Sequence, residues 1–302
     1  MAGIRQARGD RAFSIINGLL LAIIFILLLY PIWFVIIASI SNPRLVGTGQ
    51  VLIWPKDITL AGYEKILSYS DLWIGYANTL FYTIAGTAVN LAATLPCAYA
   101  LSRRDLVGRN FIMTLFVITM YFGGGMIPTY LNVRDLGLID TRRVLLISGM
   151  VSSYNIIVSR TFFGSTIPWE LHEAARIDGS SDIVTFLRIV MPLSTPIVVV
   201  MALYYGVGHW NNYFSAMIYL KSEKLYPLQL FLRKILIQSN ISKEALISSV
   251  DAETMRQLYA QQDTANLAKY CVIIVSTLPM LMIYPWLQRF FVKGVMIGSI
   301  KG

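Results

Sequence analysis

Charged and small residues gather in one short stretch between two long apolar segments, from Pro168 to Gly179. It reads Pro-Trp-Glu-Leu-His-Glu-Ala-Ala-Arg-Ile-Asp-Gly, so two carboxylates, Glu170 and Glu173, stand beside a pair of alanines. Carboxylates and alanines can form ion pairs and pack closely against another surface. Bond making is not expected of them, because the chain contains neither a nucleophile–base–acid set at membrane depth nor a Gly-x-x-x-x-Gly-Lys-Ser/Thr phosphate loop.

The same stretch carries signals for two short helices joined at a hinge. Ser165 and Thr166 are candidate caps for the first helix, and Pro168 suits its first turn, where a missing N–H costs nothing. Gly179 can adopt the left-handed conformation that ends a helix. Ser180 or Ser181 would then cap the second helix, and Pro192 marks the return to apolar sequence. We therefore predict a stiff polar projection carried on apolar helices.

Composition identifies those apolar segments as membrane-spanning. Of the 302 residues, 56% are hydrophobic and 14% are charged, and the mean hydropathy is +0.62. Soluble domains are nearer a quarter charged. The net charge of +9 comes from scattered residues rather than from a Lys/Arg run, so it favours anionic lipid headgroups over nucleic acid as a partner. Cys97 and Cys271 lie in apolar segments, where free thiols usually serve packing.

Hydropathy predicts an all-α membrane domain over residues 1–302, with six spans and both termini on one side. The spans cover residues 15–40, 72–101, 111–131, 144–163, 189–207 and 267–290. The main polar regions are a loop over 165–188, a longer loop over 211–266 and a tail over 291–302. Lys and Arg residues divide almost equally between the two sides, so they do not orient the spans.

Polar residues and glycines within these spans suggest protein-facing or cavity-facing surfaces. Asn78, Thr79, Thr83, Thr87 and Asn90 recur at helical spacing on one face of the second span, which should face protein or water. The third span contains Gly123-Gly124-Gly125 and Pro128. Irregular backbone at that depth must either line a cavity or pack closely on protein, and both readings stay open.

Residues that could line a solute path were chosen for polarity or aromaticity at span faces. Aromatic and amide groups around His209–Phe214 suit sugar binding, although an ordinary interfacial aromatic belt has the same composition. Packing explains each candidate about as well. The candidates are Asn78, Thr83, Asn90, Tyr121, Phe122, Tyr204, Tyr205, Trp210, Asn211 and Tyr213.

The polar stretch and its spacing carry a family resemblance. Glu173-Ala174-Ala175, three residues, Gly179, nine residues, Ile189, one residue and Met191-Pro192 resemble the EAA loop of ABC importer permeases. Met191 departs from the family's Leu-Pro. The region 121–140, the region 209–229 and the tail 291–298 resemble the LplC/YtcP-like branch of the carbohydrate (MalG-like) permeases. The resemblance covers nearly the whole chain and implies six spans in a MetI/MalG-like fold.

That resemblance implies a multi-subunit importer in a bacterial cytoplasmic membrane, with both termini cytoplasmic. The implied partners are a second, related permease that forms a heterodimer, two ABC ATPase subunits, an extracytoplasmic solute-binding lipoprotein and an oligosaccharide. ATP and magnesium would be bound by the ATPases, and this chain would hold no cofactor. The loop 165–188 would be the ATPase-coupling loop. Its implied contacts are Glu170, Glu173, Ala174, Ala175, Arg176, Asp178, Gly179, Ile189 and Pro192, with Lys293, Gly294 and Lys301 in an ATPase-contacting tail.

Other classes of function fit less well. A stand-alone carrier or channel driven by an ion gradient would need acidic or His residues inside the spans, which contain almost none. An intramembrane enzyme would need a catalytic set. Neither His172 nor His209 has neighbours at metal-ligand spacing, so both are predicted to be structural and no metal site is expected. A peptide or amino-acid cargo remains an alternative to sugar.

Overall fold

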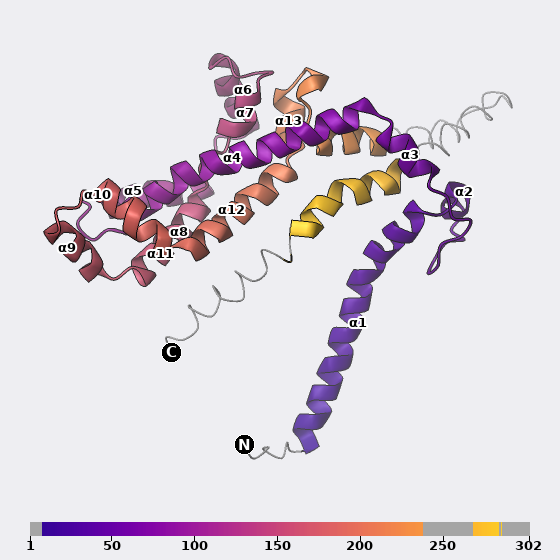
Figure 1. Cartoon of the computed structure of the whole chain (residues 1–302), viewed down its shortest axis with the longest axis horizontal. Coiled ribbons are helices and arrows are strands. Elements are labelled where there is room, and N and C mark those ends of the chain that lie inside the picture. Colours follow the sequence, from indigo (N-terminus) through magenta and orange to yellow (C-terminus); the bar gives the residue numbers. More distant parts are fainter. Residues whose placement is uncertain (1–7, 238–267, 284, 286–302) are drawn as a thin grey trace. The chain divides into compact units, whose positions relative to one another are not determined.

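The computed structural model describes residues 8–237, 268–283 and 285 as helices and connecting turns, without a β-strand among them (Figure 1). This confirms the all-α prediction for the described part of the chain. The predicted tail 291–302, with Lys293, Gly294 and Lys301, lies outside the described residues, as do residues 238–266 of the long loop. The chain divides into two compact units, which we call the N-terminal unit (residues 1–69 and 232–277) and the central unit (residues 70–231 and 278–302).

The N-terminal unit is dominated by α1 (Arg8–Ser39), followed by α2 (Pro43–Gly47) and α3 (Ala61–Leu67). The last part of α1 contacts the rest of this unit: Trp33 Nε1 donates to the Ile53 carbonyl at 2.8 Å, and the Ser39 hydroxyl hydrogen-bonds the Tyr63 hydroxyl at 2.8 Å. The segment from Phe13 to Trp33 is apolar on all sides and exposed, whereas Ile37, Ala38 and Ser39 at the end of the helix are buried. A helix that is apolar all round is suited to lipid or to another subunit.

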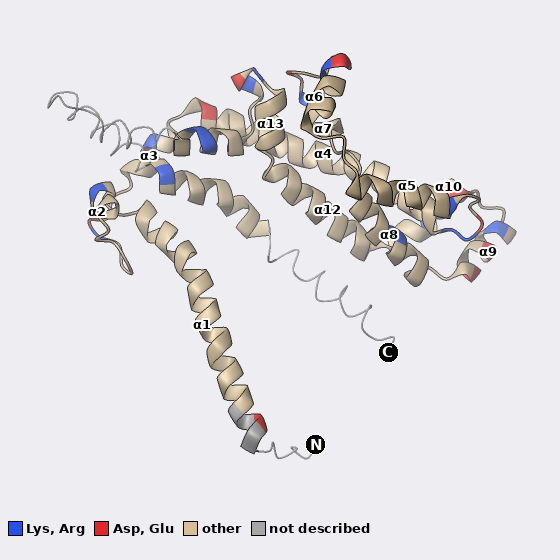
Figure 2. Ribbon diagram, turned by 180° about the vertical axis from the view of Figure 1, so that it is seen from behind, with Lys and Arg blue, Asp and Glu red and all other residues tan. Residues whose placement is uncertain are grey.

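The central unit contains the helices between residues 70 and 225. They are α4 (Ser70–Ser102), α5 (Arg109–Tyr121), α6 (Met126–Asp135), α7 (Arg142–Ile147), α8 (Ser153–Thr166), α9 (Trp169–Ile177), α10 (Asp182–Thr185), the π-helix η1 (Phe186–Val190), α11 (Met191–Leu193), α12 (Thr195–Trp210), α13 (Phe214–Tyr219) and the 3₁₀-helix η2 (Glu223–Leu225). Two further helices, residues 228–237 and Ala268–Ile283, begin in one unit and end in the other. Figure 2 shows the charged residues of this unit mainly around α9 and α10 and around α6 and α13.

Helix α4 is the central element, because α8 and α12 both pack along it. It has 33 residues and is therefore about 50 Å long at 1.5 Å per residue, longer than a bilayer's hydrocarbon core. Asn78, Thr79 and Asn90 on its polar face are buried, as the sequence spacing predicts. By length and composition the described helices supply two membrane spans, or up to four if each bent pair is one span. The six span boundaries stay a prediction.

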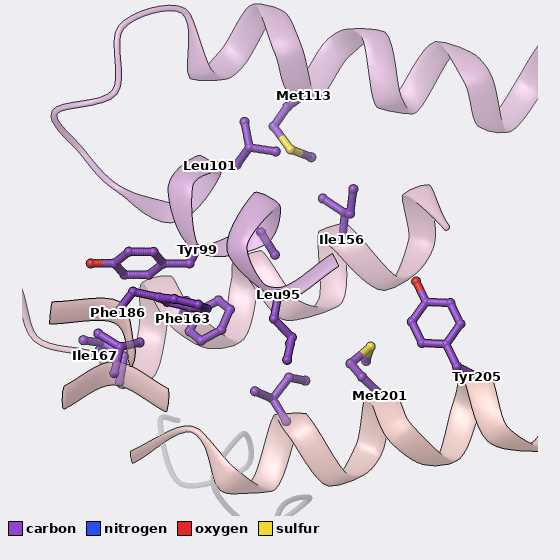
Figure 3. Close-up of a cluster of buried hydrophobic side chains, with 13 residues drawn as sticks. Leu95, Tyr99, Leu101, Met113, Ile156, Phe163, Ile167, Phe186, Met201 and Tyr205 are labelled. Carbon is purple, nitrogen blue, oxygen red and sulfur yellow. The ribbon is translucent and has the colours of Figure 1, made fainter. Parts of the chain in front are cut away.

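One hydrophobic cluster packs α4 against α8, η1 and α12 (Figure 3). Leu95 and Tyr99 come from α4, Phe163 from α8, Phe186 from η1 and Met201 from α12, and all are buried. Because lipid is as apolar as these side chains, their contribution in a membrane comes from close packing rather than from escape from water.

The predicted third span is interrupted where its glycines fall. Helices α5 and α6 meet at 114° across residues 122–125, and Gly125 has φ +83°. A Cβ built on Gly123 or Gly125 would meet no neighbour within 4 Å. Within the described chain nothing packs closely on Gly123 or Gly125, and the positive φ of Gly125 permits the break. Lining of a cavity by this segment stays a prediction. The predicted fourth span, 144–163, is likewise divided into α7 and α8 by residues 148–152.

A sharp elbow precedes α12. The segments Asp182–Leu193 and Thr195–Trp210 meet at 85°, and Ser194 between them has φ −101° and ψ 15°. Pro192 and Pro196 each lack an N–H and crowd the preceding turn, which explains the break at this position. Residues 189–193, the predicted start of the fifth span, therefore lie in the helical segment before the bend and not in α12.

The close approach of α4 and α12 at Gly86 generates a first prediction. A Cβ at Gly86 would lie 2.4 Å from His209 Nε2 and 2.5 Å from His209 Cε1, whereas a Cβ at Gly206 would meet its nearest atom, Thr87 Oγ1, at 3.6 Å. We expect Gly86→Ala to destabilise the protein by about 1–3 kcal/mol through overpacking. Thermal unfolding in detergent should show a lower Tm for Gly86→Ala and little change for the control, Gly206→Ala. Equal Tm values for both variants would contradict this interface.

Candidate functional site

The 165–188 loop begins one turn later than its capping signals suggested. Ser165 and Thr166 are the last residues of α8, so the prediction that they cap the next helix is wrong. Proline disfavours helical backbone in the residue before it, and Ile167 accordingly leaves α8 with ψ 111°. Pro168 then stands at the N-cap of α9, in extended conformation.

The end of α9 follows the sequence prediction closely. Gly179 has φ +74°, its N–H donates to the Arg176 carbonyl at 3.1 Å, and the Ser180 N–H donates to the Ala175 carbonyl at 2.9 Å. This pair of bonds is the Schellman motif, which satisfies carbonyls left open at a helix end. Ser181, of the two candidate serines, caps α10 by accepting from the Val184 N–H at 3.4 Å.

Helix α9 presents most of its predicted contact residues to solvent. The exposed ones are Glu170, Glu173, Ala174, Arg176, Asp178 and Gly179; Pro192 beyond the loop is exposed too, and Ile189 is half-buried. Ala175 is buried against the chain itself, so of the two alanines only Ala174 offers a small surface to another molecule. The Glu173 carboxylate already accepts a hydrogen bond from Trp169 Nε1 at 2.8 Å, which fixes its direction.

The loop rests on the end of α4 through Arg103. The guanidinium donates to both carboxylate oxygens of Asp105 and to Asp182 Oδ1 of α10 at 2.6 Å. The Arg103 hydrogen bonds hold the pKa of the Asp105 carboxyl below its usual range. A groove of about 570 Å³ opens beside this contact, lined mainly by Pro96, Ala100, Leu106, Ile183 and Leu187. Sequence reasoning missed the contact, because residues 103 and 182 are far apart in the chain and neither belongs to a motif that points to the other.

Three candidates for the solute path form hydrogen bonds inside the chain. The Asn78 amide donates to the carbonyls of Lys224 and Tyr226, at 2.8 and 3.1 Å. The Asn90 amide donates to the Met150 carbonyl at 2.6 Å, and its oxygen lies 2.6 Å from His209 Nε2. The Tyr205 hydroxyl lies 2.7 Å from Thr94 Oγ1 and accepts from the Ser152 N–H at 3.3 Å.

These bonds satisfy backbone groups freed where the helices break. Met150 and Ser152 belong to the interruption between α7 and α8, and polar groups there would otherwise stand unpaired at membrane depth. We call the set Asn90, His209, Thr94 and Tyr205 the polar seam. His209 takes part in this set through its bond to Asn90. Its purely structural role, and a role of Asn90 or Tyr205 in the solute path, stay predictions.

The other solute-path candidates differ in exposure. Trp210 is buried, and Tyr121, Phe122, Tyr204, Asn211 and Tyr213 are exposed. Thr83 and Thr87 line an apolar groove of about 390 Å³ between α4 and α12, and their hydroxyls have no hydrogen-bond partner in the described part of the chain. Within that part no group of His, Cys, Asp and Glu is arranged to hold a metal ion.

Several helices of this membrane chain are interrupted, and an exposed helix with a well-defined end, α9, lies between two of them. This is the architecture of a transporter's membrane subunit. Comparison with known proteins identifies the type. No family model matches the chain. It is 36% identical over 299 residues to Protein LplC of Bacillus subtilis (strain 168), covering 99% of this chain and 98% of LplC.

Two further relatives agree. The polygalacturonan/rhamnogalacturonan transport system permease protein YtcP of the same organism is 37% identical over 294 residues, covering 97% of this chain and 99% of YtcP. A crystal structure of a bacterial ABC transporter involved in the import of the acidic polysaccharide alginate contains a chain that matches with a TM-score of 0.84 at 35% identity, covering 96% of this chain and 100% of that one. The chain belongs to the family of ABC importer permeases and has their MalG-like fold.

The polar seam generates a second prediction. Asn90→Leu leaves the Met150 carbonyl and His209 without their partner, so we expect a loss of about 1–3 kcal/mol and a lower Tm in detergent. Thr87→Val, one turn away on α4, removes a hydroxyl that has no partner in the described residues and should leave the Tm unchanged. A wild-type Tm for Asn90→Leu would show that the seam does not stabilise the fold.

Proposed function

We propose that this chain forms half of the translocation pathway of a binding-protein-dependent ABC importer. A second, related permease completes the pathway as a heterodimer, two ABC ATPase subunits bind from the cytoplasm, and an extracytoplasmic solute-binding lipoprotein delivers the cargo. ATP and magnesium are bound by the ATPases. The termini lie on the cytoplasmic side of a bacterial cell membrane, which places the 165–188 loop on that side as well.

The observation that carries the proposal is that α9 exposes one face while hydrogen bonds at its end and at Glu173 hold it in a defined conformation. A docking element loses less entropy on binding when it is ordered beforehand. Helix α9 is ended by a Schellman motif and followed by a capped α10, and the Glu173 carboxylate is held by Trp169. We propose that Glu173 pairs with a cation in a cleft of an ATPase subunit and that the exposed α9 residues transmit ATPase closure to the membrane helices.

The cargo we propose is an oligosaccharide. The family is shared with a permease named for polygalacturonan and rhamnogalacturonan and with an importer named for alginate, all of them acidic polysaccharides. Acidic or plant-wall-derived oligosaccharides are therefore the class to test first. A stand-alone, ion-driven carrier is the competing function, and the scarcity of acidic residues within the apolar helices argues against it.

A pull-down tests the assembly. The tagged chain, extracted from its native membrane in mild detergent, should recover a second permease and an ABC ATPase by mass spectrometry. Recovery of the chain alone at good yield would favour the self-sufficient carrier instead.

Variants at the end of α9 test coupling. Gly179→Pro removes the N–H bond to Arg176 and forbids φ +74°, so α9 should lose its orientation. We expect oligosaccharide uptake to fall about tenfold or more, the equivalent of about 1.4 kcal/mol, with normal amounts of protein in the membrane. Glu173→Ala should lower uptake similarly by leaving the proposed partner cation unpaired.

The chain supplies a matched control at the end of α6. Gly137 has φ +67° and makes the same pair of bonds, from Gly137 N–H to Arg134 and from Leu138 N–H to Val133. Gly137→Pro imposes the same backbone damage on an exposed turn outside the 165–188 loop. Normal uptake with Gly179→Pro, or equal loss with both variants, would refute a special role of α9.

A further inference from the structure

The C-terminal end of α4 carries an aromatic stack that reaches into α9. The His172 ring lies between the rings of Tyr99 and Trp169, with centroid distances of 5.7 and 5.4 Å and interplanar angles of 15° and 19°. Tyr99 belongs to α4, whereas His172 and Trp169 belong to α9. The stack is therefore a direct contact between the helix proposed to meet the ATPase and the longest helix of the central unit.

Tyr99 anchors this stack in the hydrophobic cluster. Its ring contacts Phe186 at 4.9 Å and Phe163 at 5.9 Å between centroids, and Figure 3 shows the three side chains together. Phe163 precedes the 165–188 loop and Phe186 lies near its end. One tyrosine of α4 thus touches the beginning, the middle and the end of the segment that projects from the membrane helices.

His172 makes a hydrogen bond within its own helix turn, to Pro168, whereas its contact with Tyr99 of α4 is ring stacking. Its Nε2 is buried without a partner in the described part of the chain, and its Nδ1 lies 3.3 Å from the Pro168 carbonyl. Aromatic contacts of this kind depend on shape and ring area. A phenyl ring should therefore replace the imidazole, and a methyl group should not.

The ion pair beside the stack is the weaker of the two links. Arg103 joins α10 through Asp182, but the Asp182 side chain is 78% exposed. Water and salt screen exposed pairs, which contribute little in most measured cases. Arg103 also keeps its bonds to Asp105 when Asp182 is lost.

We propose that His172 and Tyr99 are positioning residues that transmit the movement of α9 to α4. The inference rests on the proposed coupling function and names the contact inside this chain through which that coupling acts. We call this contact, the stack of His172 on Tyr99, the joint. In this arrangement the exposed face of α9 binds the ATPase, and the buried stack converts a displacement of α9 into a displacement of α4.

The test uses the complete transporter, purified and reconstituted in liposomes, with transported solute and hydrolysed ATP measured together. His172→Ala leaves Glu173 and the exposed face of α9 unchanged, so the ATPase should still co-purify. We expect the ratio of solute transported to ATP hydrolysed to fall about tenfold or more. His172→Phe should restore the ratio to within about twofold of wild type, and Asp182→Asn should stay within the same range.

A double variant shows whether Tyr99 and His172 act through one shared contact or each affect transport separately. Tyr99→Leu should lower the ratio by itself, and Tyr99→Leu with His172→Ala should be no worse than the more affected single variant, because both remove one contact. Tyr99→Phe keeps the ring and serves as the folding control. Multiplying losses in the double variant would mean that the two residues act independently, against the proposal.

Each remaining outcome decides between the two proposals. An unchanged ratio with His172→Ala overturns the joint and leaves the coupling function intact. Loss of ATPase co-purification that His172→Phe fails to restore also overturns it, because the imidazole would then be a docking group. If wild-type protein recovers no ATPase at all, the coupling function itself fails, and the joint fails with it.

Discussion

Every backbone N–H and C=O at membrane depth needs a partner within the protein, and the central unit depends on how this requirement is met. Continuous helices meet it by themselves, but this chain interrupts its helices between α5 and α6, between α7 and α8, and before α12. At the second interruption the Asn90 amide donates a hydrogen bond to the Met150 carbonyl, and the Tyr205 hydroxyl accepts one from the Ser152 N–H. Irregular backbone is possible there because α4 and α12 bring polar side chains to it.

These hydrogen bonds require α4 and α12 to pack closely together. Asn90 can reach both the broken segment and His209 only because Gly86 leaves room for the imidazole. Asn78, Asn90 and Tyr205, which the sequence offers as candidates for solute binding, thus already form hydrogen bonds in the fold. Among the buried polar groups that remain unpaired in the described chain, the hydroxyls of Thr83 and Thr87 line the groove between α4 and α12.

Local signals predicted what local geometry determines. The spacing of Asn78, Thr79 and Asn90 identified the buried face of α4, and Gly179 with the serines after it predicted the end of α9 and the start of α10. The cap of α9 was misplaced because Pro168 limits Ile167, so α8 continues through Ser165 and Thr166 before it ends. The contacts of Arg103 with Asp182 and of Tyr99 with His172 were not predictable, because nothing in one sequence relates residues so far apart. The family resemblance supplied the fold that pattern reasoning alone could not assemble.

Helix α4 holds distant segments in one angular register. Near its beginning, Asn78 and Tyr82 hydrogen-bond the carbonyls of Lys224 and Leu225, and near its end Tyr99 packs against α9 and η1. A continuous helix joins these two groups of contacts, and in it each residue rotates the side-chain direction by about 100° around the helix axis. Removing one residue anywhere between Tyr82 and Asn90 would rotate one group of contacts away from the other by that angle. The length of α4 between its two groups of contacts is therefore as constrained as the contacts themselves, and natural variation in this family should change the side chains of that segment far more readily than its number of residues.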